Sequence, residues 1–241
     1  MAAACFSEST GLYAIDVGCD HAKLAIYLVQ SGLCRHVLAA DVVPGPLAAA
    51  RENLLNRTLR GESLTHYIDL RLNDGLCGLE DEKADVVFLL GMGGELIASI
   101  LERAAAFRAA HPNTVYVLQA MTSEPALRRY LAENGFAVTN ERAVTDKGRV
   151  YAVMTCFEDG VRRSFLPYVY EVGSFAAAHP DKAYLPYIER KLAIYDALVK
   201  KRGDAGLADA ENQAIRRALL ELKQTLTDGD KEDTDADRQR N

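Results

Sequence analysis

The sequence has no C-x-x-C pair, no long apolar run and no excess of positive charge. Its five cysteines are scattered over 241 residues as an odd total, which argues against a disulfide framework or a zinc site and for reduced thiols. No apolar stretch approaches the ~18 residues of a membrane span, and the N-terminus lacks the basic and apolar regions of a signal peptide. We therefore expect a cytoplasmic protein with no metal and no membrane partner.

The net charge of −6 is the reverse of what a nucleic-acid-binding protein usually carries. The total hides an uneven distribution, because residues 161–227 hold 11 Lys and Arg against 8 Asp and Glu, whereas residues 1–160 hold 14 against 20. Residues 228–241 contain 3 Lys and Arg, 6 Asp and Glu, and almost no apolar residues. This composition predicts a disordered acidic tail. Any nucleic-acid surface is expected within 161–227.

The chain is organised around its first predicted strand and the turn that follows it. An apolar run over Leu12–Val17, interrupted only by Asp16, leads into Gly18, and a helix is predicted to open after Asp20 and His21. A strand, a tight turn and a helix start bring backbone N–H groups and the positive end of a helix towards a ligand. A dinucleotide fingerprint would carry three glycines, so this turn alone does not identify a cofactor.

Polar residues follow the next two predicted strands. Asp41 ends the run His36–Ala40, at the position where a carboxylate binds ribose hydroxyls in α/β nucleotide folds. Asn73, Asp74 and Gly75 follow the third strand, Ile68–Leu72. The alternatives are that Asp41 only caps the next helix and that N-D-G is an ordinary turn.

The fourth predicted strand, Ala84–Leu90, is nearly all apolar and leads into Gly91, Met92, Gly93 and Gly94. A strand buried on both faces is typical of the centre of a parallel sheet. Three glycines in four residues indicate that the backbone passes close to a ligand or a base. Tight strand–helix packing is the alternative, although it explains one glycine better than three.

The predicted elements define an α/β fold. Five strand–helix units are followed by a β-hairpin, Phe136–Val144 with Arg149–Glu158. This order matches the Rossmann-like seven-stranded sheet of S-adenosylmethionine-dependent methyltransferases better than that of a dehydrogenase, which would continue with βαβ units. Residues 1–160 are therefore expected to form the methyltransferase domain.

A linker over 160–180 and an antiparallel helical hairpin are predicted to follow. Leu185, Ile188, Leu192, Tyr195 and Val199 recur at the spacing of a coiled-coil seam, and a second seam follows a turn at 203–206. Each basic residue of the hairpin could simply be solvated, but together they form the surface best suited to a phosphate backbone. The candidate RNA-binding residues of this surface are Arg190, Lys191, Lys200, Lys201, Arg202, Arg216 and Arg217.

Six short motifs resemble one family, the bacterial tRNA methyltransferases that modify N1 of adenine 22. They are D-V-G-C-D-H-A at Asp16–Ala22, A-D-V-V-P-G-P at Ala40–Pro46, N-D-G-L at Asn73–Leu76, G-M-G-G at Gly91–Gly94, L-Q at Leu118–Gln119 and D-K-G-R-V-Y at Asp146–Tyr151. The resemblance covers nearly the whole chain. It implies S-adenosylmethionine as cofactor, tRNA as partner and a C-terminal coiled coil that engages tRNA. We also expect a monomer.

Methyl transfer to N1 of adenine needs alignment more than acid–base chemistry, since N1 already carries a lone pair. The expected catalytic residues are Asp20 and, second, His21, with a helix N-cap and a buried structural histidine as the respective alternatives. The expected cofactor-binding residues are Asp16, Gly18, Asp41, Asp74, Gly75, Gly91, Met92 and Gly93, and Gly94 is expected to contact the substrate base.

Two other functions stay open at this point. One is methyl transfer to another RNA, a protein or a small molecule, although the absence of N/D-P-P-Y/F after the fourth strand argues against many enzymes that act on exocyclic amines. The other is a non-catalytic adaptor that keeps a relic nucleotide pocket. The retained Gly18, Asp41, Asp74 and Gly91 argue against such decay.

Overall fold

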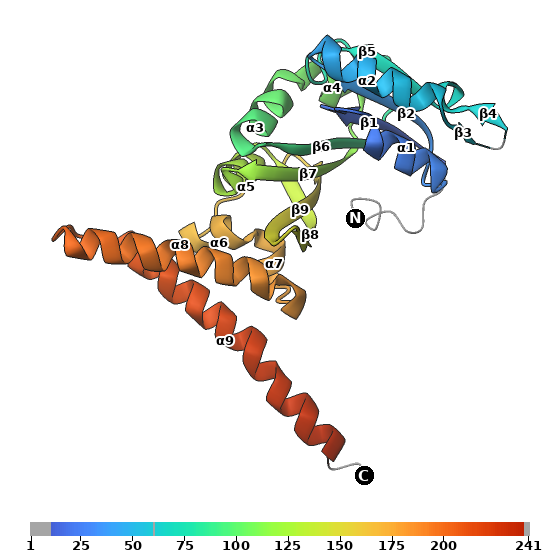
Figure 1. Cartoon of the computed structure of the whole chain (residues 1–241). Coiled ribbons are helices and arrows are strands. Elements are labelled where there is room, and N and C mark those ends of the chain that lie inside the picture. The colour runs from blue at the N-terminus through green and yellow to red at the C-terminus, as the bar shows by residue number, and fades with distance from the viewer. Residues whose placement is uncertain (1–10, 60, 239–241) are drawn as a thin grey trace.

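A seven-stranded sheet forms the centre of the protein (Figure 1). The computed structural model describes residues 11–59 and 61–238, with side chains to Thr227. The strand order is β5-β2-β1-β6-β7-β9-β8; β9 runs antiparallel to both its neighbours and the other pairs are parallel. The strands are β1 (Leu12–Val17), β2 (Cys34–Asp41), β5 (Ile68–Leu72), β6 (Val86–Gly93), β7 (Val115–Thr122), β8 (Phe136–Asp146) and β9 (Arg149–Glu158). The predicted fold class is confirmed.

Helices cover both faces of the sheet because its central strands carry apolar residues on both faces. One face packs against α1 (Lys23–Gln30) and α2 (Pro44–Leu55), and the other against α3 (Gly94–Arg103), α4 (Ala105–Ala110) and α5 (Glu124–Glu133). Phe88 and Leu89 of β6 are both fully buried and lie in the cores of opposite faces. A small hairpin of β3 (Thr58–Leu59) and β4 (Glu62–Ser63) and the turn η2 (Leu64–His66) precede β5.

The segment 160–180 is not a linker, which corrects our expectation. It forms two short helices, α6 (Pro167–Val172) and α7 (Ser174–Ala178), before the turn η3 (Lys182–Tyr184). Tyr170, Val172 and Ala176 are buried. Apolar burial, which the mixed composition of the segment concealed, therefore fixes these helices against the rest of the chain.

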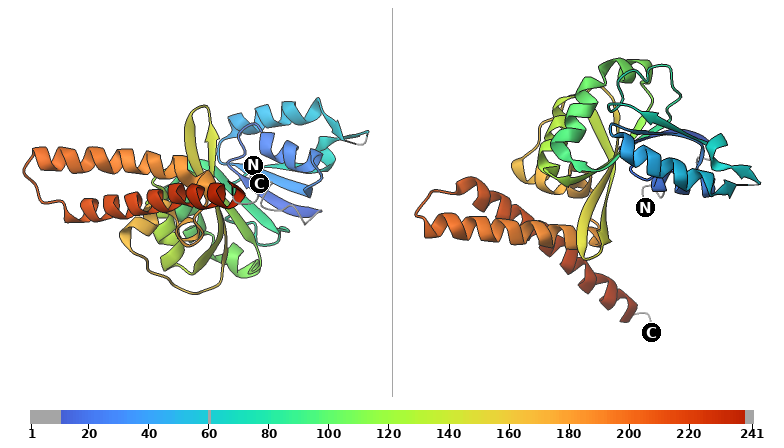
Figure 2. Two further views of the ribbon diagram at one scale, coloured as in Figure 1. Left: turned by 90° about the horizontal axis from the view of Figure 1, so that it is seen from below. Right: turned by 45° about the horizontal axis from the view of Figure 1, so that its top comes forward.

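The predicted helical hairpin is formed by α8 (Leu185–Asp204) and α9 (Ala210–Arg238), and it projects from the sheet domain (Figures 1 and 2). Its seam buries Ile188, Leu192, Tyr195, Ile215 and Leu219. None of the helices in the described part of the chain is both long and apolar enough for a membrane span.

The helix α9 continues to Arg238, whereas we expected disorder from residue 228. The backbone stays helical there although the stretch is rich in Asp and contains Gly229. Residues 239–241 of the expected tail lie outside the described residues.

The sheet and the helical hairpin are joined through the buried guanidinium of Arg128 on α5. It donates to Oε1 of Glu141 on β8 at 2.5 and 2.9 Å, to the carbonyls of Tyr170 and Glu171 at 2.9 and 2.8 Å, and to the hydroxyl of Tyr187 on α8 at 3.1 Å. Arg128 and Glu141 are almost completely inaccessible to solvent. One side chain therefore links the sheet, α6 and the helical hairpin.

We expect Arg128→Met to lower the free energy of unfolding by about 3–5 kcal/mol, because it leaves the Glu141 carboxylate buried without a cation. Urea unfolding measures the loss, with the exposed Arg35→Met as the matched control. Adding Glu141→Leu to Arg128→Met should recover part of the loss. If Arg128→Met alone has the same free energy of unfolding as the parent, the assigned role of this ion pair is refuted.

Candidate active site

The turn after β1 has an unusual backbone. Gly18, Asp20 and Ala22 all have left-handed φ angles, of 71°, 50° and 55°. The N–H groups of Gly18 and Cys19 both donate to the carbonyl of Ala40, at 2.8 and 3.0 Å. Such backbone strain in non-glycine residues persists where surrounding contacts enforce it, and it is frequent at functional sites.

Gly18 lies against the end of β6. A Cβ on Gly18 would collide with the terminal methyl group of Met92. The strands β1 and β6 are neighbours, while the chain passes from β1 to β2 on the other side. This reversal of strand order is the switch point at which open α/β sheets bind ligands.

Asp41 ties three strand ends together. Its Oδ2 accepts from the Asp20 amide at 3.2 Å, its Oδ1 from the Val43 amide at 3.0 Å, and its carbonyl from the Asn73 amide at 2.9 Å. Val43 is the N-cap residue of α2, so one carboxylate oxygen of Asp41 binds the start of that helix while the other binds the turn after β1. The ends of β1, β2, β5 and β6 therefore meet at one edge of the sheet.

Asp74 and Gly75 both contact α3. Both carboxylate oxygens of Asp74 accept from Arg103 at the end of α3, at 2.6 and 3.1 Å, and this hydrogen bonding lowers the pKa of Asp74. Gly75 is buried against the side chain of Ile100. Both contacts fasten the turn after β5 to α3, so the expected ligand role of these two residues is not supported.

The four residues Gly91–Gly94 do not form a single loop. β6 continues to Gly93 and pairs with β7 through two register shifts, which are bulges that bend a strand. The exposed Gly91 donates its N–H to Oε1 of Gln119 at 3.0 Å. Gly94 is buried with no room for a Cβ beside the Ser123 carbonyl. For Gly94 the packing alternative is therefore correct, and a contact with the base is excluded.

Asp20 and His21 project from the turn after β1. Their side chains are 68% and 45% exposed, and His21 Nε2 lies 3.4 Å from Asp20 Oδ1. α1 begins at Lys23 with Ala22 as its N-cap and no side-chain cap. Asp20 is thus not a helix cap and His21 is not a buried histidine, so both alternatives are wrong. The two side chains are accessible to a substrate.

Asp16 lies beneath the turn. It is buried, Oδ2 has no hydrogen-bond partner among the described residues, and burial raises the pKa of this carboxyl to about 7. A backbone hydrogen bond from Ala25 opposes the rise and the Asp41 carboxylate adds to it. A buried carboxylate oxygen without a hydrogen bond destabilises the folded protein, unless a bound group donates one to it.

A cleft of about 360 Å³ lies beside Gly91, at the ends of β6 and β7 and against the β8–β9 hairpin. Its volume lies within the range of small-molecule sites. Gln119 stands between the cleft and the Gly91 amide. The lining residues are Leu90, Gln119, Met121, Val144, Asp146, Tyr151 and Val153.

Two of the predicted RNA-binding residues belong to the domain junction. Lys191 is buried and pairs with Glu171 at 3.0 Å and Glu124 at 3.7 Å. Arg190 pairs with Glu124 at 2.5 Å. Lys191 follows Tyr187 and Ile188 by four and three residues, which places it on the packed face of α8. The expectation that Lys191 contacts RNA is wrong, and Arg190 is engaged within the protein.

The other predicted RNA-binding residues lie further along the hairpin. Arg202 pairs with Asp209 at 3.1 Å and Arg216 with Asp196 at 2.5 Å. Lys200, Lys201 and Arg217 are exposed and have no ion pair among the residues with described side chains. These three are therefore the predicted RNA-binding residues that have no ion pair within the part of the hairpin whose side chains are described.

With this geometry established, comparisons identify the family. The family model of the tRNA (adenine(22)-N(1))-methyltransferases, TrmK, matches residues 14–224. The chain belongs to this family. The tRNA (adenine(22)-N(1))-methyltransferase of Bacillus subtilis (strain 168) is 28% identical over 225 residues, which cover 90% of this chain and 91% of the relative. The resemblance seen in the motifs is thus confirmed.

Solved structures of similar proteins agree. The Streptococcus pneumoniae protein Sp1610, in complex with S-adenosyl-L-methionine, has a TM-score of 0.74 and 25% identity, over 92% of this chain and 96% of that one. The M. capricolum TrmK in complex with S-adenosyl-homocysteine has a TM-score of 0.69 and 20% identity, over 94% and 95% of the two chains. The latter supports the fold alone.

None of the lining residues of the cleft was predicted as a site residue, and three of them carry polar groups, namely Gln119, Asp146 and Tyr151. All three lie in motifs that carry the family resemblance. Their clustering depends on the pairing of β7 with β9 and of β8 with β9. Within the described residues no group of three or more His, Cys, Asp or Glu is placed to hold a metal ion.

Asp16 makes stability depend on pH. Its pKa is 3.8 unperturbed and about 7 in the folded protein, so the folded state retains the proton more strongly and stability falls as pH rises through this window. The asparagine of the Asp16→Asn variant does not titrate, so this variant should lose no stability in this way. We expect its free energy of unfolding, relative to that of the parent, to rise by up to roughly 1.4 kcal/mol per pH unit between about pH 5 and pH 7. Urea unfolding at a series of pH values measures the difference, and a constant difference would contradict the burial argument.

Proposed function

We propose that this chain binds S-adenosylmethionine at the β1/β6 switch point and methylates N1 of adenine 22 in tRNA. The observation that carries the proposal is the meeting of Gly18, Asp41 and Met92 at one sheet edge, with a base-sized cleft beside it. Membership of the tRNA (adenine(22)-N(1))-methyltransferase family supports the reaction and the substrate.

The residues at the switch point fit the cofactor. Gly18 lacks the Cβ that would fill the space before Met92. Asp16 offers a buried oxygen without a donor, which suits the cofactor's ammonium group, and the Asp41 carboxylate suits its ribose hydroxyls. When bound, S-adenosylmethionine supplies an electrophilic methyl group next to the site. The similar Sp1610 protein was crystallised in complex with S-adenosyl-L-methionine, which supports the choice of cofactor.

The protein's contribution is mainly positioning. N1 of neutral adenine needs no deprotonation, so the residues have to hold the base in line and exclude water. The methylated ring is cationic, and carboxylates next to it stabilise the developing charge. Asp20 at the turn and Asp146 in the cleft are proposed for this role, with His21 orienting Asp20 across their 3.4 Å contact.

The target base is proposed to enter the cleft beside Gly91. N1 lies on the Watson–Crick edge, so the base has to leave its pair before reaction. Tyr151 offers a ring on which an extruded base stacks. Gln119 fixes the Gly91 backbone that separates the cleft from the switch point. Lys200, Lys201 and Arg217 are proposed to contact tRNA, with the protein acting as a cytoplasmic monomer.

Methyl transfer tests the proposal directly. The purified chain is incubated with methyl-labelled S-adenosylmethionine and unmodified tRNA, and the modified base is mapped. We expect label on N1 of adenine 22 and none on tRNA with guanine at that position. Cofactor binding without transfer to tRNA would favour another substrate, and absence of cofactor binding would favour a non-catalytic adaptor.

We expect Asp41→Ala to weaken S-adenosylmethionine binding by roughly 10- to 100-fold, because hydrogen bonds to a charged group are lost. It also releases the Asp20 amide. Calorimetry measures cofactor affinity, and a filter assay should give unchanged tRNA binding. The exposed Asp81→Ala is the control. Unchanged cofactor affinity in Asp41→Ala would leave Asp41 with a structural role alone.

A further inference from the structure

A side chain of α2 reaches the turn after β1. Nδ2 of Asn53 donates to the carbonyl oxygen of His21 at 3.0 Å, although the two residues are 32 positions apart in the chain. Asn53 is partly buried and lies outside the motifs that carry the family resemblance. This hydrogen bond connects α2 directly to the backbone of a proposed catalytic residue.

The His21 carbonyl needs this donor because α1 does not supply one. In a continuous α-helix a carbonyl accepts from the amide four residues later, which for His21 is that of Ala25. The Ala25 amide instead forms a hydrogen bond with the buried Asp16 carboxylate. Ala22, which lies between His21 and the first residue of α1, has a left-handed φ of 55°. Asn53 therefore supplies the donor that the helix withholds.

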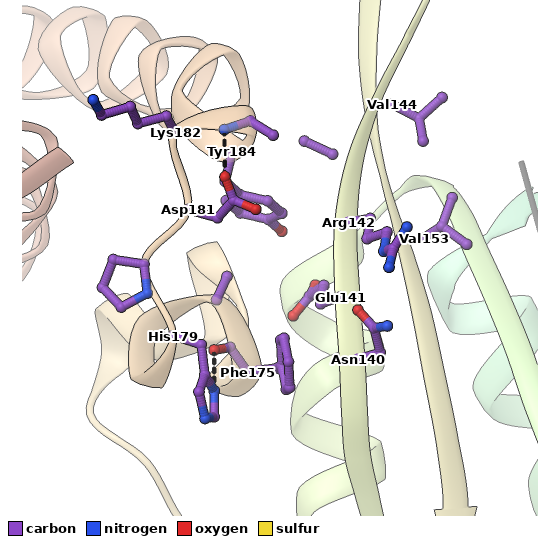
Figure 3. Close-up of a pocket in the computed structure, with 14 residues that line it drawn as sticks. Asn140, Glu141, Arg142, Val144, Val153, Phe175, His179, Asp181, Lys182 and Tyr184 are labelled. Carbon is purple, nitrogen blue, oxygen red and sulfur yellow. Dashed lines mark hydrogen bonds between the residues drawn. The ribbon is translucent and has the colours of Figure 1, made fainter. Parts of the chain in front are cut away.

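The start of α1 has no support of a local kind. The groove of about 960 Å³ between β8 and the segment from α7 to η3 contains an example of such support (Figure 3). There Asp181, the N-cap of η3, accepts from the Ala183 amide two residues later, at 2.9 Å. Ala22, the N-cap of α1, has only a methyl side chain and cannot accept in this way. The turn before α1 therefore depends on residues from other elements.

The dipeptide of Asp20 and His21 is held at both ends by such residues. Oδ2 of Asp41 accepts from the Asp20 amide at 3.2 Å, and Asn53 donates to the His21 carbonyl. Asp20 itself has a left-handed φ of 50°, a conformation that costs energy in a residue with a Cβ and persists where surrounding contacts enforce it. The Asp20 and His21 side chains therefore owe their directions to both anchors.

We propose that Asn53 is a positioning residue for methyl transfer, an inference that rests on the proposed function. Its amide group fixes the backbone of His21 and thereby the placement of the Asp20 and His21 side chains beside the base. Asn53 acts through the turn, since its donor is engaged by the carbonyl. Small displacements in an aligned site lower rates strongly, so one hydrogen bond of ordinary strength affects the reaction.

A purely structural role for Asn53 is the alternative, in which the contact only fastens α2 to the turn. Ala22 of the turn and Ala50 of α2 are, however, both completely buried and belong to the same apolar cluster. This cluster already attaches α2 to the start of α1. Stability alone therefore does not require the Asn53 amide.

Single-turnover kinetics of the full-length protein, with unmodified tRNA and saturating S-adenosylmethionine, test the role of the donor. We expect Asn53→Ala to lower the rate of methyl transfer by about fivefold, the value of one hydrogen bond. Asn53→Asp should lower it further, because a carboxylate then faces the carbonyl. Side-chain packing alone would give the opposite order, since Asp has nearly the shape of Asn. Parental rates in both variants would overturn the proposal.

Asn56 provides the matched control. It is exposed at the end of α2, and its Nδ2 donates to the Glu52 carbonyl of the same helix at 3.1 Å. Asn56→Ala and Asn56→Asp should keep the parental rate. Calorimetry should give the parental affinity for S-adenosylmethionine in all four variants, because the Gly18 amide and Asp41 are held independently of Asn53. A loss confined to cofactor affinity in the Asn53 variants would contradict the proposed role.

A double-mutant cycle shows whether Asn53 acts through the turn. In a protein that already carries Asp20→Ala and His21→Ala, no catalytic side chain of the turn is left for Asn53 to position. Adding Asn53→Ala should then leave the residual rate unchanged, whereas independent effects would multiply. A further loss as large as that in the parent would show that Asn53 acts in another way, and the proposal would fail.

Amide hydrogen exchange separates this proposal from the proposed function, because it requires no activity. We expect Asn53→Ala, but not Asn56→Ala, to accelerate exchange at the amides of Asp20 and Ala22, which are hydrogen-bonded in the parent. Unchanged exchange in Asn53→Ala would overturn the anchoring of the turn.

The two measurements together assign each outcome. If the parent methylates adenine 22 and Asn53→Ala matches its rate, the positioning role fails while the activity stands. If the parent transfers no methyl group to tRNA and exchange nevertheless accelerates in Asn53→Ala, the anchoring of the turn stands and the proposed reaction fails.

Discussion

The hydrogen bonds from Gly18 and Cys19 to the Ala40 carbonyl hold the candidate site together. They bind the turn after β1 to the end of β2, and the resulting left-handed backbone turns Asp20 and His21 towards solvent. Asp41 extends the same connection to β5. Because these contacts are made mainly by the backbone, the site is preorganised by the sheet itself.

The junction between the sheet and the helical hairpin depends on ion pairs that are buried or partly buried. Arg128, Arg190 and Lys191 each pair with a carboxylate at the contact between α5, α6 and α8. Removing such ions from water is costly, so geometry and additional hydrogen bonds have to compensate. Arg128 meets this requirement by binding two carbonyls and a tyrosine hydroxyl. The orientation of the helical hairpin is thereby fixed.

Sequence was sufficient for the fold class and for the meeting of three strand ends, because parallel strands place Gly18, Asp41 and Met92 at one edge. The sequence did not show that Gly94 and Gly91 have different roles. Gly94 packs against the Ser123 carbonyl and Gly91 has open space around it, and only the structure gives these distances. Lys191 was assigned to RNA although its spacing from Ile188 put it on the packed face. The groove along β8 has no local signal, because residues far apart in the chain create it.

The length of α8 has a mechanical consequence. The helix has 20 residues, which correspond to about 30 Å, and its first turns are anchored by Arg190 and Lys191. Lys200 and Lys201 are therefore carried on a stiff lever that reaches away from the sheet. A single molecule that contacts both this tip and the cleft therefore has to span a distance set by the length of α8.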